Sequence, residues 1–262
     1  MRVIDLADEH RDLFAKCLMD WSDLAKEAGP RRQAWVERFL ARGLRAKLAV
    51  DDQGTVGGMI QYLPIEQSSA RGRGLYFIQC IWVHGHKEGR GDFRGRGMGS
   101  ALLAAAEADA RALGAKGMAA WGIWLPVWMK ASWFRRHGYG KADRRGLAVL
   151  LWKPFTEDAK PPRWLSAPKP VPANVPGKVT VTTFVNGWCL ACDLSCERAK
   201  RAAAEFPDQV VLREIDVSEP SALDQWRRSD EIFVDGKQVR TGPPPSFEKL
   251  RRLLARRVRK LS

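Results

Sequence analysis

The chain has 262 residues, of which 45% are hydrophobic and 28% are charged. This balance is typical of a folded globular protein long enough for two domains, and it excludes an intrinsically disordered chain. The longest apolar runs are too short to cross a bilayer, and the first residues carry no secretion signal. The sequence therefore predicts a cytoplasmic protein with no membrane partner.

The formal net charge is +14 at pH 7. Lysine and arginine can bind nucleic acid because they displace counterions from phosphates. Here the basic residues are spread along the chain with acids among them, so we expect a small polyanionic ligand rather than a nucleic-acid partner. The last predicted helix, residues 246–261, is basic and is either a solvated face or a surface for anionic lipid or RNA. The oligomeric state is not indicated.

Seven prolines lie between residues 153 and 178. Neither a helix nor a central strand tolerates that density. We therefore predict a proline-rich linker at residues 156–177, which joins a first domain at residues 1–155 to a smaller domain at residues 178–262.

Hydrophobic periodicity in the first domain predicts an α/β fold with helices packed on a central sheet. The expected strands are residues 3–6, 45–50, 55–63, 75–83, 118–123 and 146–152. The expected helices are residues 9–26, 32–43, 97–113 and 127–137. The strand at 75–83 is rich in aromatic and β-branched residues, so we expect both of its faces to be buried.

The strongest motif is a glycine- and arginine-rich loop between this strand and the next helix. It consists of Arg94, Gly95, Arg96, Gly97, Met98, Gly99 and Ser100. Glycine lets the backbone approach a ligand closely, and the first amides of a helix have no partners inside it. The loop can therefore hold a pyrophosphate, with charge-assisted contacts from the arginines. The alternative is a flexible basic loop, because a glycine-rich pattern alone is weak evidence.

The run from Arg94 to Gly99 resembles the acetyl-CoA signature of the GCN5-related N-acetyltransferases (GNAT), Gln/Arg-x-x-Gly-x-Gly/Ala. The preceding strand ends in Ile81, Trp82 and Val83, as the fourth strand of that family does. The connection at residues 84–93 is longer than the family's usual one. The resemblance implies a GNAT-type mixed central sheet and acetyl transfer from acetyl-CoA to a small amine.

The resemblance also implies where acetyl-CoA would bind. Pantetheine would enter a V-shaped opening between the fourth and fifth strands and pair with the backbone of Ile81 and Val83. A strand amide near Ile81 or Trp82 would stabilise the developing oxyanion. The loop from Arg94 to Ser100 would hold the pyrophosphate.

The proton donor is missing from its usual position. Many relatives place a tyrosine ahead of a Gly-Phe pair, and alignment on Gly138 and Tyr139 puts Phe134 there. Phenylalanine cannot donate a proton, so another group or water must protonate the thiolate, or catalysis is weak or absent. This leaves open a degenerate GNAT domain that binds acetyl-CoA as a regulatory ligand.

Candidate catalytic residues are His84 and Cys80, with Glu88 in the long connection as a further possibility. Histidine can act as a base near neutral pH, although at a strand end it is commonly a solvated cap. Cys80 can equally be a small buried hydrophobe. Four tryptophans could wall a pocket for a flat or apolar amine or belong to the core: Trp121, Trp124, Trp128 and Trp133.

The second domain is marked by three of the five cysteines, Cys189, Cys192 and Cys196. Its expected elements are a strand at 178–185, a helix ending at 205, a strand at 210–216, a helix at 221–227, a hairpin at 231–239 and the basic helix. The Trp188-Cys189-Leu190-Ala191-Cys192 run before the first helix resembles the thioredoxin fold. We therefore expect a smaller thioredoxin-like α/β domain, whose helix dipole favours a thiolate at Cys189.

Two features depart from thioredoxins. Ser229 and Asp230 stand where a cis-proline is expected, and Cys196 lies one helical turn past Cys192. Cys189, Cys192 and Cys196 could therefore hold a soft metal or metalloid ion as well as a disulfide, or Cys196 could be a buried helix residue. Residues 242–246 are similar to those of YoaP-like domains, which occur fused behind N-acetyltransferase domains.

Three functions remain open from the sequence. The chain is an N-acetyltransferase with a redox or metal-binding Cys-x-x-Cys domain, or an acetyl-CoA-binding regulatory or metal-binding protein with a degenerate GNAT domain, or a thiol oxidoreductase with a scaffold domain. The glycine loop favours the first two, because it predicts acetyl-CoA binding.

Overall fold

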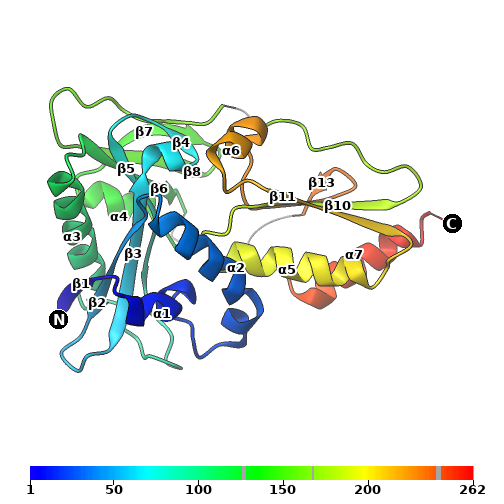
Figure 1. Cartoon of the computed structure of the whole chain (residues 1–262), viewed down its shortest axis with the longest axis horizontal. Coiled ribbons are helices and arrows are strands. Elements are labelled where there is room, and N and C mark those ends of the chain that lie inside the picture. Colours follow the sequence, from blue (N-terminus) through cyan, green and yellow to red (C-terminus); the bar gives the residue numbers. More distant parts are fainter. Residues whose placement is uncertain (126–127, 167, 240–242, 262) are drawn as a thin grey trace. The chain divides into compact units, whose positions relative to one another are not determined.

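The computed structural model describes residues 1–125, 128–166, 168–239 and 243–261 (Figure 1). It divides into two compact units, one of residues 1–22 and 36–165, the other of residues 23–35 and 166–262. The sequence predicts that residues 23–35 belong to the first domain and residues 156–165 to the linker. Residues up to 165 join the first unit because β9 (Arg163–Trp164) pairs with β4 (Ala70–Arg71).

A seven-stranded sheet forms the centre of the first unit, in the order β1-β2-β3-β5-β6-β8-β7. Its strands are β1 (Arg2–Asp5), β2 (Arg45–Val50), β3 (Val56–Pro64), β5 (Leu75–Val83), β6 (Gly117–Ile123), β7 (Gly140–Arg145) and β8 (Ala148–Pro154). β5 and β6 are parallel, and the other neighbours are antiparallel. The expected mixed α/β sheet is confirmed. The sequence pattern does not predict β7, because this edge strand is polar and largely exposed and shows no apolar alternation.

The first two helices differ from their predictions. α1 (Arg11–Ala15) ends early because Cys17 and Leu18 have φ angles of 51° and 60°, a left-handed conformation that no helix continues. α2 (Asp23–Leu40) then runs through Pro30, where a break was expected. A proline removes one backbone hydrogen bond from a helix, which is the local reason to expect a break. The helix is nevertheless continuous, so the predicted break is wrong.

Two further helices border the site described below. α3 (Met98–Ala112) buries an apolar stripe that includes Leu102, Leu103 and Ala106 in a core shared with the sheet. Each fully buried leucine stabilises such a core by about 1.5–3 kcal/mol. α4 (Ala131–Arg136) is shorter than the expected helix at 127–137, whose first residue lies outside the described part of the chain.

The second unit contains a four-stranded mixed sheet in the order β11-β10-β12-β13. Its elements are β10 (Val179–Val185), α5 (Leu190–Ala204), β11 (Val210–Asp216), α6 (Pro220–Trp226), β12 (Glu231–Val234), β13 (Lys237–Gln238) and α7 (Phe247–Val258). β10 is parallel to β11 and antiparallel to β12. Each element expected from the sequence is present here, and the fully buried β10 lies inside the sheet. Among the described residues, no helix is both long and apolar enough to cross a membrane.

Candidate active site

The parallel strands β5 and β6 separate toward their carboxyl ends. They pair over residues 75–78 and 117–120, whereas β5 continues to Val83 and β6 to Ile123. A bulge at Gln79 marks the point of separation, because Cys80 pairs with Gln61 while Ile78 pairs with Tyr62. One edge of β5 is thus open along residues 79–83.

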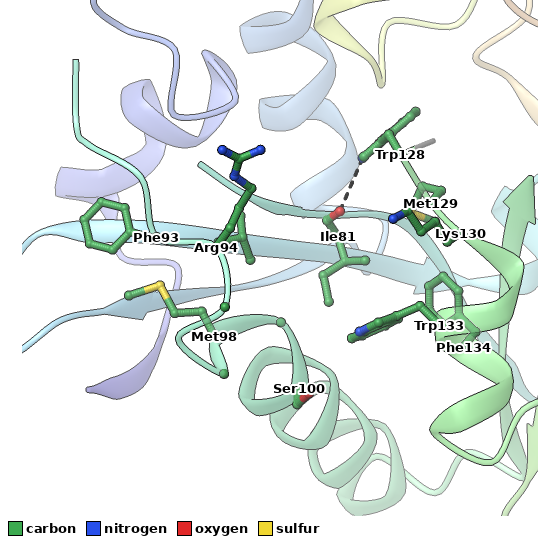
Figure 2. Close-up of a pocket in the computed structure, with 14 residues that line it drawn as sticks. Ile81, Phe93, Arg94, Met98, Ser100, Trp128, Met129, Lys130, Trp133 and Phe134 are labelled. Carbon is green, nitrogen blue, oxygen red and sulfur yellow. Dashed lines mark hydrogen bonds between the residues drawn. The ribbon is translucent and has the colours of Figure 1, made fainter. Parts of the chain in front are cut away.

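Two tryptophan side chains reach this open edge. The Trp121 indole nitrogen donates a hydrogen bond to the Gln79 carbonyl oxygen at 2.7 Å. The Trp128 indole nitrogen donates a hydrogen bond to the Ile81 carbonyl oxygen at 3.3 Å (Figure 2). The two rings meet edge to face with centroids 5.3 Å apart. The indoles therefore pair carbonyl groups of β5 that β6 does not reach.

The glycine-rich loop leads into α3 beside this edge. Gly97 precedes the first helical residue with a φ of 79°, and Gly95 has a φ of 75°, a conformation that favours glycine. No side chain caps this end of α3 within the described residues, so its first amides can bind an anion. A Cβ atom at Gly99 would lie 3.5 Å from the Trp133 ring and 3.9 Å from Val83, which places Gly99 at the surface of a cavity.

This cavity measures about 510 Å³ and lies between the loop, the end of β5 and α4 (Figure 2). Its described lining consists of Ile81, Val83, Phe93, Arg94, Gly95, Gly97, Met98, Gly99, Ser100, Trp128, Met129, Lys130, Trp133 and Phe134. Eight of the ten predicted acetyl-CoA-binding residues are among them. Trp82 and Arg96 are not, and the Arg96 guanidinium lies over the Phe93 ring at 4.9 Å.

The charged side chains of the lining are the cations Arg94 and Lys130. Arg94 binds the Asp92 carboxylate at 2.6 Å, and these hydrogen bonds hold the pKa of Asp92 well below its usual value. Because the Arg94 side chain is 69% exposed, it can exchange this carboxylate for a phosphate. A polyanion therefore fits this end of the cavity.

Part of the chain is similar to a known protein family. Residues 7–127 match the model of the acetyltransferase (GNAT) family. Residues 7–127 carry a GNAT acetyltransferase domain. No curated protein sequence matches the chain significantly.

Several solved structures are similar to the GNAT domain. A GNAT family acetyltransferase from Brucella melitensis in complex with acetyl-CoA is 17% identical, with 61% of this chain and 90% of that chain covered and a TM-score of 0.41. A PaiA N-acetyltransferase from Thermoplasma acidophilum in complex with coenzyme A is 13% identical, with 59% of this chain and 100% of that chain covered and a TM-score of 0.43. A ribosomal-protein-alanine N-acetyltransferase from Brucella melitensis is 17% identical, with 59% of this chain and 100% of that chain covered and a TM-score of 0.44.

His84 and Cys80 do not line the cavity of the GNAT domain. His84 is fully buried, its Nε2 accepts a hydrogen bond from the Trp21 indole at 3.1 Å, and its Nδ1 donates to the Gly91 carbonyl oxygen at 2.7 Å. Both ring nitrogens are thus engaged in holding the long connection at 84–93. Cys80 is buried in β5, and Glu88 is exposed in the connection. The catalytic role expected of His84 and Cys80 therefore finds no support in their placement.

Phe134, which stands at the position of the usual tyrosine, lines the cavity. Its ring is fully buried and packs edge to face against Trp133 and Tyr139, with centroids 5.0 and 5.5 Å away. The sequence pattern does not indicate His137, whose Nε2 lies 2.9 Å from the Ser100 hydroxyl and whose ring centroid lies 4.1 Å from that of Trp133. His137 therefore links the start of α3 to α4, a contact between distant segments for which the sequence carries no signal.

A separate candidate site lies in the second unit at the start of α5. Cys189 is the residue before the first helical residue, and Cys192 is in the first turn. The Cys192 thiol hydrogen bonds to the Cys189 sulfur, which lowers the pKa of Cys189 and raises that of Cys192. The neighbouring Trp188 indole donates to the Asp230 carboxylate at 2.8 Å. One thiol of the pair is therefore poised to ionise first.

The placement of Cys196 favours the buried helix residue over the third ligand of a metal site, the two alternatives that the sequence leaves open. Cys196 is 2% exposed and packs in the apolar core with residues such as Val181 and Leu250. Within the described ranges, no three histidine, cysteine, aspartate or glutamate side chains are placed to hold a metal ion. Spacing along α5 put Cys196 one turn from Cys192, but packing of the helix against the sheet turns Cys196 into the core.

Asp193 is a feature of this unit that the sequence pattern does not predict. Its side chain is fully buried, and neither carboxylate oxygen has a hydrogen-bond partner in the described structure. Burial, followed by the charge of Asp230, raises the pKa of Asp193 to about 8. Its place directly after Cys192 was the only signal available. Asp193 is therefore a proton-holding group beside the cysteine pair.

Proposed function

We propose that the GNAT domain binds acetyl-CoA in the cavity between β5, α3 and α4 and transfers the acetyl group to a small amine. The observation that carries this proposal is the open edge of β5 beside the uncapped start of α3. Pantetheine amides would pair with the backbone at Ile81 and Val83. The pyrophosphate would lie at the first amides of α3, with Arg94 as its counter-charge. Acetyl-CoA supplies an activated thioester carbonyl.

Substitution of Gly99 tests this proposal. Gly99→Leu places a side chain in the cavity, while its Cβ would make ordinary contacts at 3.5 Å, and leucine is the better helix former by about 0.8 kcal/mol. We expect calorimetry to detect acetyl-CoA binding by the wild type and none by Gly99→Leu, with the thermal midpoint retained. Ala104→Leu, at an exposed position of the same helix, is the matched control and should bind normally.

The same samples separate an enzyme from a regulatory binding protein. A panel of primary amines is incubated with acetyl-CoA and the chain, and acetylated products are quantified by chromatography. Product formation that Gly99→Leu abolishes supports acetyl transfer. Acetyl-CoA binding without any acetylated product would favour the regulatory alternative, and unchanged binding by Gly99→Leu would contradict the proposed cavity.

As a second function, we propose that the other unit is a thioredoxin-like, YoaP-like domain whose cysteine pair exchanges with disulfides. The parallel β10 and β11, the antiparallel β12 and β13 and the closing α7 support this fold. The lowered pKa of Cys189 supports the chemistry. Of the residues that resemble YoaP-like domains, Gly242 lies outside the described part of the chain.

The exchange requires a disulfide substrate. The Cys189 thiolate attacks one sulfur of that disulfide, forms a mixed disulfide and releases the first substrate thiolate. Cys192 then loses its proton and attacks the Cys189 sulfur, which releases the second thiolate. The substrate is reduced, and the protein is left with a Cys189–Cys192 disulfide.

Oxidised glutathione provides the test of this second function. After incubation, mass spectrometry of alkylated peptides should find a disulfide between Cys189 and Cys192 in the wild type. Cys189→Ser should abolish it, whereas Cys17→Ser, the matched substitution in the first unit, should not. Failure of the wild-type pair to oxidise would contradict the proposal.

A further inference from the structure

Ser100 lines the cavity of the GNAT domain at the start of α3 (Figure 2). The first backbone hydrogen bond of this helix runs from the Ala101 amide to the Gly97 carbonyl oxygen at 3.1 Å. The amides of Met98, Gly99 and Ser100 therefore precede the helical hydrogen bonds and can donate to an anion. A diphosphate held by these amides would lie within reach of the Ser100 hydroxyl.

The Ser100 hydroxyl is hydrogen bonded to His137, the residue that follows α4. Its Oγ lies 2.9 Å from His137 Nε2, and His137 Nδ1 lies 2.9 Å from the Trp133 carbonyl oxygen. A carbonyl oxygen only accepts hydrogen bonds, so Nδ1 carries a proton. In a neutral imidazole Nε2 is then the acceptor, and the Ser100 hydroxyl donates its one proton to it.

A bound diphosphate would change this arrangement. A hydroxyl has one proton, so Ser100 cannot donate to a phosphate oxygen and to His137 Nε2 at the same time. If Ser100 donates to the phosphate, the contact with His137 survives only when Nε2 carries a proton and donates to the Ser100 oxygen. Because Nδ1 keeps its own proton, the ring is then an imidazolium. Histidine changes charge between about pH 5 and 8 in ordinary surroundings, so this proton is available near neutral pH.

The groups around His137 are compatible with an imidazolium. Its ring faces the Trp133 ring with centroids 4.1 Å apart, and an indole face stabilises a nearby cation. Lys153 on β8 donates to the His137 carbonyl oxygen at 3.3 Å, but Glu107 on α3 neutralises the same ammonium group at 2.7 Å. The charged neighbours on α4 are exposed, so solvent screens them: Arg135 and Arg136.

The cations already assigned to the cavity leave a need for this charge. Arg94 is paired with Asp92 at 2.6 Å, so the pair adds no net charge to the loop. Lys130, the other cation of the described lining, precedes α4 and so lies at the opposite end of that helix from His137. An imidazolium linked through Ser100 would add one positive charge beside the helix amides.

We propose that His137 belongs to the diphosphate site through Ser100, and that acetyl-CoA binding draws one proton onto its Nε2. This inference rests on the acetyl-CoA binding proposed above. The Ser100 O–H turns from Nε2 to a phosphate oxygen, solvent supplies a proton to Nε2, and Nε2–H then donates to the Ser100 oxygen. No covalent bond to the ligand forms. Because the bound state holds more protons than the free state, this contact strengthens acetyl-CoA binding as pH falls.

Calorimetry of the full chain with acetyl-CoA tests this proposal. Titrations at pH 7 in two buffers of different ionisation enthalpy give the number of protons taken up. His137→Gln can still hydrogen bond to Ser100 but cannot titrate, so the wild type should take up about half a proton or more beyond this variant. The ratio of Kd for His137→Gln to Kd for the wild type should grow by about fivefold or more from pH 8 to 6.

The comparison between proteins removes the contribution of the ligand. The 3′-phosphate of coenzyme A itself titrates near about pH 6, but it does so with every variant alike. Ser100→Ala deletes the link and should lose the same proton uptake as His137→Gln. His86→Gln is the matched control, because His86 is exposed and outside the described cavity lining, and it should behave as the wild type.

The possible failures are distinguishable. Equal proton uptake by the wild type and His137→Gln, or uptake retained in Ser100→Ala, overturns the role of His137 and leaves the acetyl-CoA proposal in place. If His137→Gln does not fold, as judged by its thermal midpoint, Ser100→Ala decides by the same measure. Absence of acetyl-CoA binding by the wild type at every pH overturns both proposals.

Discussion

The indole nitrogen of Trp128 donates a hydrogen bond to the Ile81 carbonyl oxygen across 3.3 Å, at the open edge of β5 (Figure 2). The proposed pantetheine arm would need the backbone of the same strand. The side chain and the ligand would therefore compete for one acceptor. Trp128→Phe removes the donor but keeps an aromatic ring.

From this competition we predict that Trp128→Phe binds acetyl-CoA more tightly than the wild type by about 0.5–1.5 kcal/mol, the net value of one hydrogen bond. Isothermal calorimetry measures the difference. Trp124→Phe serves as the control, because Trp124 does not line the cavity and should leave the affinity unchanged. Weaker binding by Trp128→Phe would mean that the indole contributes to the acetyl-CoA site instead.

His84 is predicted to stabilise the fold and not to act as the base. His84→Ala leaves the Trp21 indole and the Gly91 carbonyl without their partner and opens a buried void. The free energy of unfolding should fall by about 2–4 kcal/mol, measured by urea denaturation. The pH profile of acetyl transfer should keep its shape. If the rate of acetyl transfer by His84→Ala no longer changed with pH on one side of that profile, His84 would act as the base.

Asp193 should make the second unit less stable as pH rises. Its pKa is about 8 in the folded chain against an ordinary 3.8, so between about pH 4 and 8 the folded state holds a proton that the unfolded state has lost. The free energy of unfolding therefore falls across this window. Asp193→Asn should abolish roughly 2–4 kcal/mol of that fall.

Hydrogen exchange of the β10 amides at pH 5 and pH 8, corrected for intrinsic rates, measures this effect. Asp208→Asn, which changes an exposed carboxylate of the same unit, should behave as the wild type. An equal pH dependence in Asp193→Asn and the wild type would show that Asp193 does not hold the proton.

Cys189 should be alkylated at lower pH than Cys192. Hydrogen bonding from Cys192 lowers the pKa of Cys189, so its thiolate forms below the range of an ordinary thiol, whereas the pKa of Cys192 is raised. Iodoacetamide labelling followed by peptide mass spectrometry across pH 5–9 should give two separated profiles. In Cys192→Ala, the Cys189 profile should move upward because the hydrogen bond is gone. Coincident profiles in the wild type would contradict this assignment.

Much of the fold could be predicted locally. The apolar stripe of α3 and the alternating or fully apolar strands are periodic patterns within single segments, and they placed the main elements correctly. The pattern failed where no periodicity exists, as in the polar edge strand β7, or where a strong local signal was overridden, as at Pro30 inside α2. The branch of β5 from β6 was expected only through the resemblance of the loop.

The sequence alone determined the order of elements, the glycine loop at the start of α3 and the Cys189–Cys192 pair, because each depends on residues within a few positions of one another. Tertiary structure decided which side chains are available for chemistry. The Trp21 indole donates a hydrogen bond to His84, and packing against the sheet buries Cys196. The buried Asp193 carboxylate has no hydrogen-bond partner in the described structure. These outcomes depend on contacts between residues far apart in the chain, whose distances no local pattern encodes.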